Sequence, residues 1–245
     1  METRERTQDF VIAIRPRKFV VVLVIILAIL ILLSLAIDVT EELTGERNLF
    51  GFRESFDLTR GPNISRFYNM LLLLIGALLL ASIAQYHKNV RGAGSWMWAV
   101  MAVIFLTLAL LKVTDFLSVT GLALDKLRVP WFTRGAVALP FLFILVLYFG
   151  YFVYKLPGDV RGEVLLAAAV YLTGAVVLDT FEWWNYADFM SGSLYYDVLS
   201  TLEETLEMTG VIIFIHALLR YLERYVHQVR INITGQNAKI EPYEN

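Results

Sequence analysis

Three glutamates lie close together in the segment TLEETLEMTG, residues 201–210, which opens the last long apolar run of the chain. Glu203 and Glu207 are four residues apart, so a helix would bring both onto one face, with Glu204 beside them. Carboxylates inside an apolar run typically bind protons or cations or take part in acid–base chemistry. Two glutamates on one poorly hydrated face should not both stay ionised at neutral pH. We therefore expect one of them to have a raised pKa, or the pair to share a proton or hold a cation.

Further ionisable residues occur in two other apolar runs. Lys112 and Asp115 are three residues apart, as are Asp179 and Glu182, so each pair would share a helix face. The helical rise puts all of them within roughly 10 Å of the same end of their helices as the glutamates. Lys112 would offset part of the carboxylate excess. The sequence therefore predicts one polar pocket at that end, formed by Glu207, Glu203, Glu204, Asp179, Glu182, Lys112 and Asp115.

Simpler roles remain open for some of these residues. Ser200-Thr201-Leu202-Glu203 fits a capping box, so Glu203 and Glu204 would then only mark a helix start in the headgroup region. Lys112 with Asp115 would equally fit a structural ion pair, and Asp179 with Glu182 would fit the membrane interface, since two tryptophans follow them.

Two neighbours of the glutamates have structural interpretations. Gly210 continues the side of the helix that carries Glu203 and Glu207, and it would let another helix approach closely. His216 lies nine residues after Glu207, which places it on the opposite face. It is typical of a hydrogen-bonded residue that packs helices together.

The elements that must position these residues are membrane helices. The chain has 245 residues, of which 58% are hydrophobic and only 18% charged, whereas soluble domains carry about 25% charged residues. Six apolar runs have the length of about 20 residues that a spanning helix needs, and none alternates as barrel strands do. The sequence predicts an all-α bundle of six transmembrane helices: Phe19–Ile37, Phe67–Tyr86, Trp96–Ser118, Gly135–Tyr154, Glu163–Glu182 and Ser200–Leu222.

Lysine and arginine set the expected orientation. With the N-terminus inside, the inner segments hold thirteen of them and the outer loops seven, which favours both termini in the cytoplasm. The expected organisation is a cytoplasmic segment 1–18, a transmembrane domain 19–222 with an outer loop 38–66, and a cytoplasmic tail 223–245. The pocket would then open outward, in the inner (plasma) membrane of the cell. Trp96 and Trp98 fit an aromatic belt at the inner face.

Composition also limits the chemistry. The chain has no cysteine, which excludes disulfides and cysteine-ligated metals, and three histidines give little support to a metal site, so none is predicted. A net charge of −2 does not favour a nucleic-acid partner. No motif identifies a cofactor or a catalytic residue. The expected partners are the lipid bilayer and, for a subunit of a complex, another membrane protein.

Residues 202–210, LEETLEMTG, with HALLRYL at residues 216–222, resemble the final helix of a family of uncharacterised bacterial multi-pass membrane proteins. In that family the helix reads E-E-x-x-E-M-x-G and closes with A-L-L-x-Y. The FDL and NIS stretches before the second run, at 56–58 and 63–65, are similar to the same group. The family has a histidine–glutamate pair in the third helix, where this chain has Lys112. The resemblance implies that a metal bound there is lost or replaced by the lysine, and it brings no activity.

Three functions are compatible with this pattern. The pocket would suit a small transport protein that binds a proton, a cation or a small solute. An accessory or assembly subunit of a membrane complex would fit the absence of a catalytic motif. A membrane-embedded enzyme acting on a lipid would use the carboxylates as an acid–base pair, although no nucleophile motif accompanies them.

Overall fold

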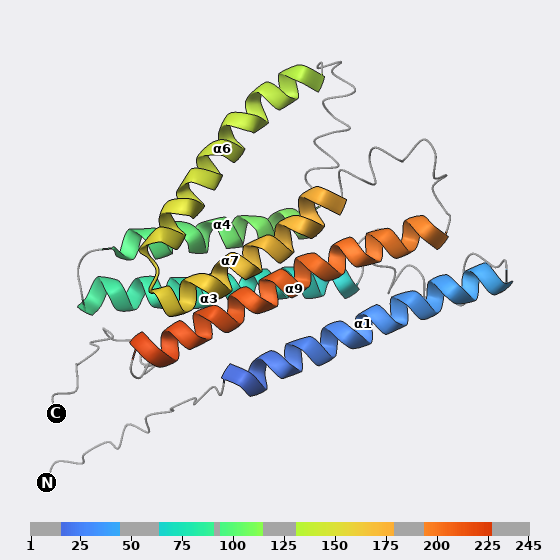
Figure 1. Cartoon of the computed structure of the whole chain (residues 1–245), viewed down its shortest axis with the longest axis horizontal. Helices are drawn as coiled ribbons and strands as arrows, with labels where there is room; N and C mark the ends of the chain where they lie inside the picture. The colour runs from blue at the N-terminus through green and yellow to red at the C-terminus, as the bar shows by residue number, and fades with distance from the viewer. Residues whose placement is uncertain (1–15, 45–63, 91–93, 115–130, 179–193, 227–245) are drawn as a thin grey trace, which may run out of the picture.

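The computed structural model describes residues 16–44, 64–90, 94–114, 131–178 and 194–226. These residues form helices and no strand, as the sequence predicts (Figure 1). The chain therefore has the all-α fold of a helical membrane protein. In lipid only a helix or a closed barrel satisfies every backbone N–H and C=O group internally, which is why such apolar runs become helices.

The helix bounds follow the apolar runs closely but extend beyond most of them. Five of the helices, all except α6, are long and apolar enough to cross a membrane, and in α6 the apolar segment is Phe143–Lys155. The final turns of α7 continue as a π-helix, η1. The elements are α1 (Pro16–Thr44), α3 (Ile64–Val90), α4 (Ser95–Thr114), α6 (Trp131–Lys155), α7 (Gly158–Leu172), η1 (Thr173–Leu178) and α9 (Leu194–Tyr225).

Several helices extend beyond their predicted bounds. The outer loop was expected at 38–66, but α1 continues to Thr44 and α3 already begins at Ile64. The Thr40 and Thr44 hydroxyls each donate to the carbonyl four residues back, which helps the polar end of α1 to stay helical. The final helix was expected at Ser200, but α9 begins at Leu194. The predicted helix ends at Ser118 and Glu182 lie outside the described residues.

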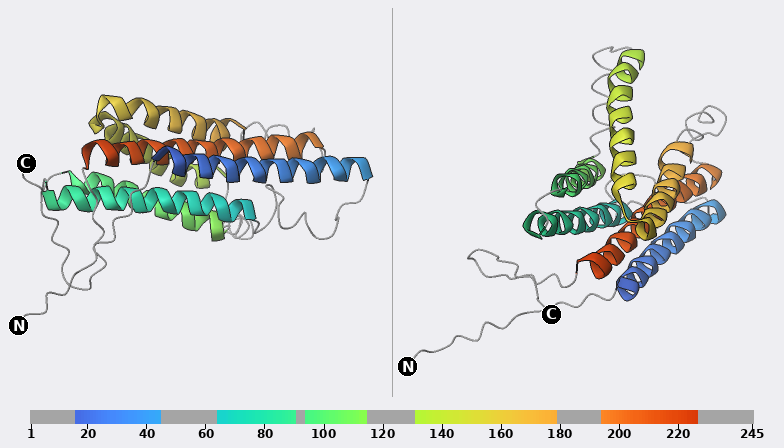
Figure 2. Two further views of the ribbon diagram at one scale, coloured as in Figure 1. Left: turned by 90° about the horizontal axis from the view of Figure 1, so that it is seen from below. Right: turned by 60° about the vertical axis from the view of Figure 1, so that its left-hand side comes forward.

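Helix α9 is the centre of the bundle. It packs along α1, α3 and the continuous α7–η1 helix, while α3 pairs closely with α4 (Figures 1 and 2). Gly94, just before α4, has a φ of 86°, a conformation that glycine adopts without strain. Helix α6 diverges from the others and stays close to the bundle mainly where it meets α7 (Figure 2).

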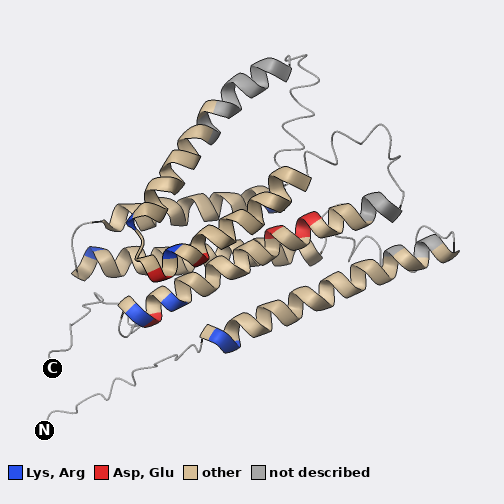
Figure 3. Ribbon diagram, in the orientation of Figure 1, with Lys and Arg blue, Asp and Glu red and all other residues tan. Residues whose placement is uncertain are grey.

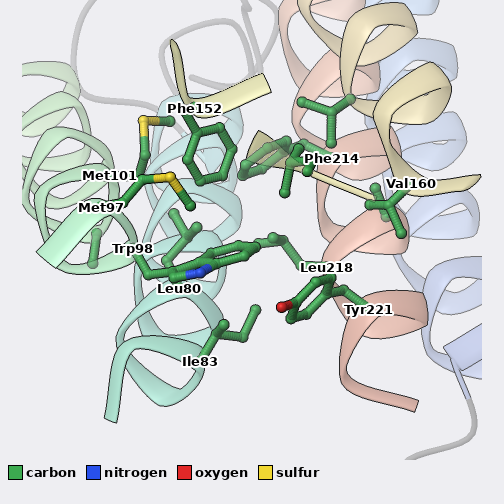
Figure 4. Close-up of a cluster of buried hydrophobic side chains, with 14 of the residues drawn as sticks. Leu80, Ile83, Met97, Trp98, Met101, Phe152, Val160, Phe214, Leu218 and Tyr221 are labelled. Carbon is green, nitrogen blue, oxygen red and sulfur yellow. The ribbon is translucent and has the colours of Figure 1, made fainter. Parts of the chain in front are cut away.

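Two apolar clusters hold the helices together, and α9 contributes to both. One lies between α1, α3 and α9, with Met208 and Ile215 fully buried in it. The other joins α3, α4, the end of α6, α7 and α9 (Figure 4). Trp98 belongs to this second cluster and is only 3% exposed, so its expected place in an aromatic belt is wrong. Its ring stacks on His87 and contacts Tyr221, which hydrogen-bonds His87 at 2.8 Å.

The turn between α6 and α7 is short and well braced. Pro157 directly precedes α7, where proline's missing N–H is no loss to a helix start. Arg161 in the first turn of α7 donates from Nη2 to the carbonyls of Tyr154 and Leu156, at 2.8 and 2.9 Å. These bonds satisfy carbonyls that the end of α6 leaves free.

Candidate functional site

An ion pair between α4 and α9 lies in the half of the bundle that holds the start of α3 and the end of α4. Lys112 Nζ is 2.5 Å from Glu207 Oε2, and the Glu207 side chain is only 6% exposed. Asn69 on α3 donates from Nδ2 to the same Glu207 oxygen at 3.3 Å. Three helices therefore meet at one buried carboxylate. We call the half of the bundle that holds the start of α3 and the end of α4 the outer half. The half that holds Lys155 and Arg224 is the inner half.

Glu204 is the second carboxylate of this cluster. It is half-buried, and its Oε2 atom is shielded from solvent without a hydrogen-bond partner. Lys112 and Glu207 are the charged groups that act on it most strongly, and Arg66 acts on it more weakly. Asn69 lies beside both carboxylates. Two carboxylates thus share one close lysine. This agrees with the expectation that Lys112 offsets part of the excess of carboxylates.

Within the described part of the chain, four buried side-chain oxygens on α3 and α9 have no hydrogen-bond partner: Ser65 Oγ, Asn69 Oδ1, Thr201 Oγ1 and Glu204 Oε2. Helices α3 and α9 run in the same direction, because Asn69 meets Glu207 near their starts and His87 meets Tyr221 near their ends. Ser65 is one turn before Asn69, and Thr201 is about one turn before Glu204. The four oxygens therefore follow the facing sides of two neighbouring helices.

Two glycines let the α7–η1 helix approach α9 closely at this level. A Cβ at Gly210 would lie 2.8 Å from the Tyr171 backbone nitrogen and 2.9 Å from the Ala167 carbonyl oxygen. A Cβ at Gly174 would lie 2.7 Å from the Glu203 carbonyl oxygen. The close approach expected at Gly210 is confirmed. It also brings Tyr171 next to the cluster, where Tyr171 interacts electrostatically with Lys112 and both buried glutamates.

The predicted pocket residues fall into three groups. Glu207, Glu204 and Lys112 come together, and the backbone carbonyl of Glu203 lies against Gly174 of η1. Asp115, Asp179 and Glu182 lie outside the described residues.

The capping-box interpretation of Glu203 and Glu204 is wrong. Both lie well inside α9, about 14 Å from its first residue at the helical rise. A glutamate so far along the helix does not cap its N-terminus. Its carboxylate therefore needs polar partners from neighbouring helices.

Sequence reasoning did not find Asn69, Ser65, Thr201 and Tyr171 as neighbours of the carboxylates. The sequence feature that could have predicted such a neighbour is Asn69, an amide in an otherwise apolar run. Such a residue is costly in lipid and faces a polar partner.

A second set of charged residues joins α7 and α9 in the inner half (Figure 3). Glu163 accepts a hydrogen bond from Arg220 Nη1, and His216 Nδ1 is 3.3 Å from its other oxygen. About one turn further along α9, Arg224 and Tyr225 both contact Asp159, each at 2.7 Å. The histidine expected to pack helices therefore contacts a carboxylate of the neighbouring helix α7.

The side-chain chemistry of the outer cluster is that of oxygen ligands. Carboxylate, amide and hydroxyl oxygens are hard donors that suit protons and hard cations rather than soft transition metals. Among the described residues, no three histidine, aspartate or glutamate side chains gather as metal ligands.

The whole described bundle falls within one family. Residues 19–222 match a family model described as a domain of unknown function, DUF8692. The chain belongs to this family. The expected membership of an uncharacterised family is thus confirmed. No curated protein and no solved structure matches the chain.

Proposed function

We propose that this protein binds a proton or one small monovalent cation at Glu204, in the cluster between α3, α4, α7 and α9, as the binding step of transport. The observation that carries the proposal is the buried Glu204 oxygen, which has no partner among the described residues, together with three further buried oxygens on α3 and α9 that also lack one there. Buried polar groups without partners are costly, so a ligand that satisfies several of them at once binds favourably.

Charge supports a single positive ligand. Glu204, Glu207 and Lys112 together carry one net negative charge when all three are ionised, and Arg66 acts on Glu204 less strongly than Lys112 and Glu207 do. Lys112 contacts Glu207 at 2.5 Å and also acts on Glu204, so one lysine offsets only one of the two carboxylate charges. One proton or one monovalent cation neutralises the site, whereas a divalent cation would leave it with an excess positive charge in a poorly solvated region.

The setting proposed for this activity is the plasma membrane, with both termini in the cytoplasm and the cluster near the outer surface. The excess of lysine and arginine in the predicted inner segments supports this orientation. The resemblance of the final helix to bacterial multi-pass proteins supports a bacterial inner membrane.

The test measures the thermal unfolding temperature of the purified full chain in detergent micelles. One series varies the pH. A second series compares sodium, potassium, ammonium and N-methylglucamine salts at equal ionic strength. A ligand at one hundred times its dissociation constant stabilises the folded state by about 2.7 kcal/mol. We expect the wild type to be stabilised by acid or by one of the small cations relative to the bulky one. The Glu204→Gln variant should lose that response.

Glu223→Gln is the matched control, because Glu223 is exposed on the same helix. It should keep the wild-type response. A wild type whose stability is indifferent to both pH and cation identity would refute binding at Glu204. If binding is found, proton or sodium flux into proteoliposomes tests the transport step, and flux that Glu204→Gln does not reduce would limit the protein to binding.

A further inference from the structure

The cations near the inner ends of α6, α7 and α9 fall into two kinds. Arg220 and Arg224 are neutralised by carboxylates of α7, as described above. Lys155 and Arg161, which flank the turn between α6 and α7, contact no carboxylate in the part of the chain that the structure describes. At this corner of the bundle, two positive charges therefore have no counter-charge from the described helices.

Arg161 is held in place by hydrogen bonds that use only its Nη2 atom. Its Nη2 atom is used on the two carbonyls of α6, and its guanidinium lies 5.9 Å from the Tyr154 ring centroid. A guanidinium has five N–H donors in a planar fork that matches phosphate oxygens. The bonds to α6 therefore orient the group before any ligand arrives.

Aromatic rings surround the second cation. Lys155 Nζ lies 5.6 and 5.8 Å from the ring centroids of Tyr151 and Tyr154. Trp96, at the start of α4, stacks on Tyr151 with the ring centroids 6.0 Å apart. Trp96 is 54% exposed and Tyr154 is 70% exposed. Exposed tryptophan and tyrosine beside a lysine are typical of the depth of lipid headgroups.

An apolar stripe leads away from this corner along α6. Phe143, Leu147, Tyr151 and Tyr154 are spaced by four, four and three residues, so they share one face of the helix, and all four are exposed. The stripe runs from the two cations toward the middle of the helix. An occupant with a phosphate at one end and a hydrocarbon chain at the other would match both parts.

We propose that Arg161, Lys155, Tyr154 and Trp96 bind the phosphate of an anionic phospholipid, whose acyl chain lies along the exposed stripe of α6. Arg161 supplies the two N–H donors of Nη1 to the phosphate, because Nη2 is used on α6 and Nε is shielded from solvent, and lysine supplies a point charge held at headgroup depth by the two tyrosines. The bound lipid would cover α6 on the side where it diverges from the bundle (Figure 1). This site is separate from the outer cluster and does not depend on the function proposed for it.

The test measures lipid binding to the purified full chain by native mass spectrometry, with phosphatidylglycerol and phosphatidylcholine of the same acyl chains. We expect the wild type to retain phosphatidylglycerol in preference. Lys155→Gln should weaken that binding about fivefold, the effect of one basic residue near an anionic headgroup. Lys155 makes only ring contacts, so this variant should fold.

Lys88→Gln is the control for general charge loss, because Lys88 is an exposed cation at the inner end of α3. It should bind as the wild type does. Arg161→Lys keeps the charge but not the fork, and it should weaken binding while the protein stays folded by thermal unfolding. Equal binding of the two lipids by the wild type, or unchanged binding in both site variants, would overturn the proposal. Displacement of the lipid by inorganic phosphate alone would show a phosphate site that does not recognise lipid.

Discussion

The buried ion pair between Lys112 and Glu207 allows the outer cluster to be tested by a double-mutant cycle. Lys112→Met and Glu207→Gln each remove one charge with little change of shape. The first leaves two buried carboxylates beside an amide. The second leaves the lysine with Glu204 as its remaining close carboxylate. The double variant removes both charges.

The structure sets the expected magnitudes. Glu207 is 6% exposed and Lys112 is 27% exposed, so solvent screens the pair poorly on the glutamate side. Breaking a buried pair by removing one partner costs about 3–5 kcal/mol, whereas removing both charges is often close to neutral. Lys112→Met should approach this range, and Glu207→Gln should cost less because Glu204 compensates. The coupling energy between the two changes should be roughly 0.5–3 kcal/mol.

The assay is reversible unfolding in mixed micelles of mild detergent and dodecyl sulfate, followed by circular dichroism and by tryptophan fluorescence. The result that would refute the reasoning is strict additivity, with the double variant as unstable as the two single changes predict together. Additivity would mean that Lys112 and Glu207 do not interact in the folded protein, and the cluster would then lose its central contact.

Three further changes test the packing around the site. Gly210→Ala should destabilise the protein by about 1–3 kcal/mol, because the new methyl group would meet the Tyr171 backbone and force α7 away from α9. Tyr68→Phe should cost roughly 0.5–1.5 kcal/mol in unfolding, because it removes the buried 2.6 Å hydrogen bond to the Leu23 carbonyl that ties α3 to α1. Arg224→Gln should leave stability nearly unchanged in the same unfolding assay, because that arginine is 60% exposed and solvent weakens its ion pair.

A matched control separates crowding from a simple glycine effect. Gly162→Ala places its methyl group in open space inside α7, so it should be neutral or stabilise slightly. Equal destabilisation by the Gly162 and Gly210 changes would contradict a close α7–α9 contact. A stability loss in Arg224→Gln as large as that in Lys112→Met would contradict the contrast in burial between the two ion pairs.

The sequence predicted the helices well because a membrane span is set by length and hydrophobicity, which are local properties. It also predicted that Lys112 and the final-helix glutamates share a level, since depth follows from the helical rise alone. The sequence could not show which helix faces Glu207. Asn69 reaches it from another helix, 138 positions away in the chain. That contact depends on how α3 rotates about its own axis, which is decided by packing.

Helix ends were harder to predict than helix cores. The start of α9 was missed because Ser200 and Glu203 form a valid local capping pattern, while the helix continues upstream to Leu194. Similarly, the inner pairing of Glu163 with Arg220 links two residues that each read as ordinary ends of apolar runs. In both cases the local sequence pattern predicted a helix end, whereas contacts between helices decide the structure.

The central position of α9 has a consequence for how the protein is made. Residues of α9 belong to both apolar clusters, and α9 follows all the other described helices in the chain. While the earlier helices enter the membrane, neither cluster is complete and Lys112 has no glutamate from α9 beside it. A lysine in this state costs about 2.5–3.5 kcal/mol at mid-membrane, so it should reach toward the headgroups until α9 arrives. Insertion of the last helix would then complete both apolar clusters and stabilise the bundle. A chain that stops before residue 194 would leave helices that cannot assemble, and membrane proteases would be expected to degrade them.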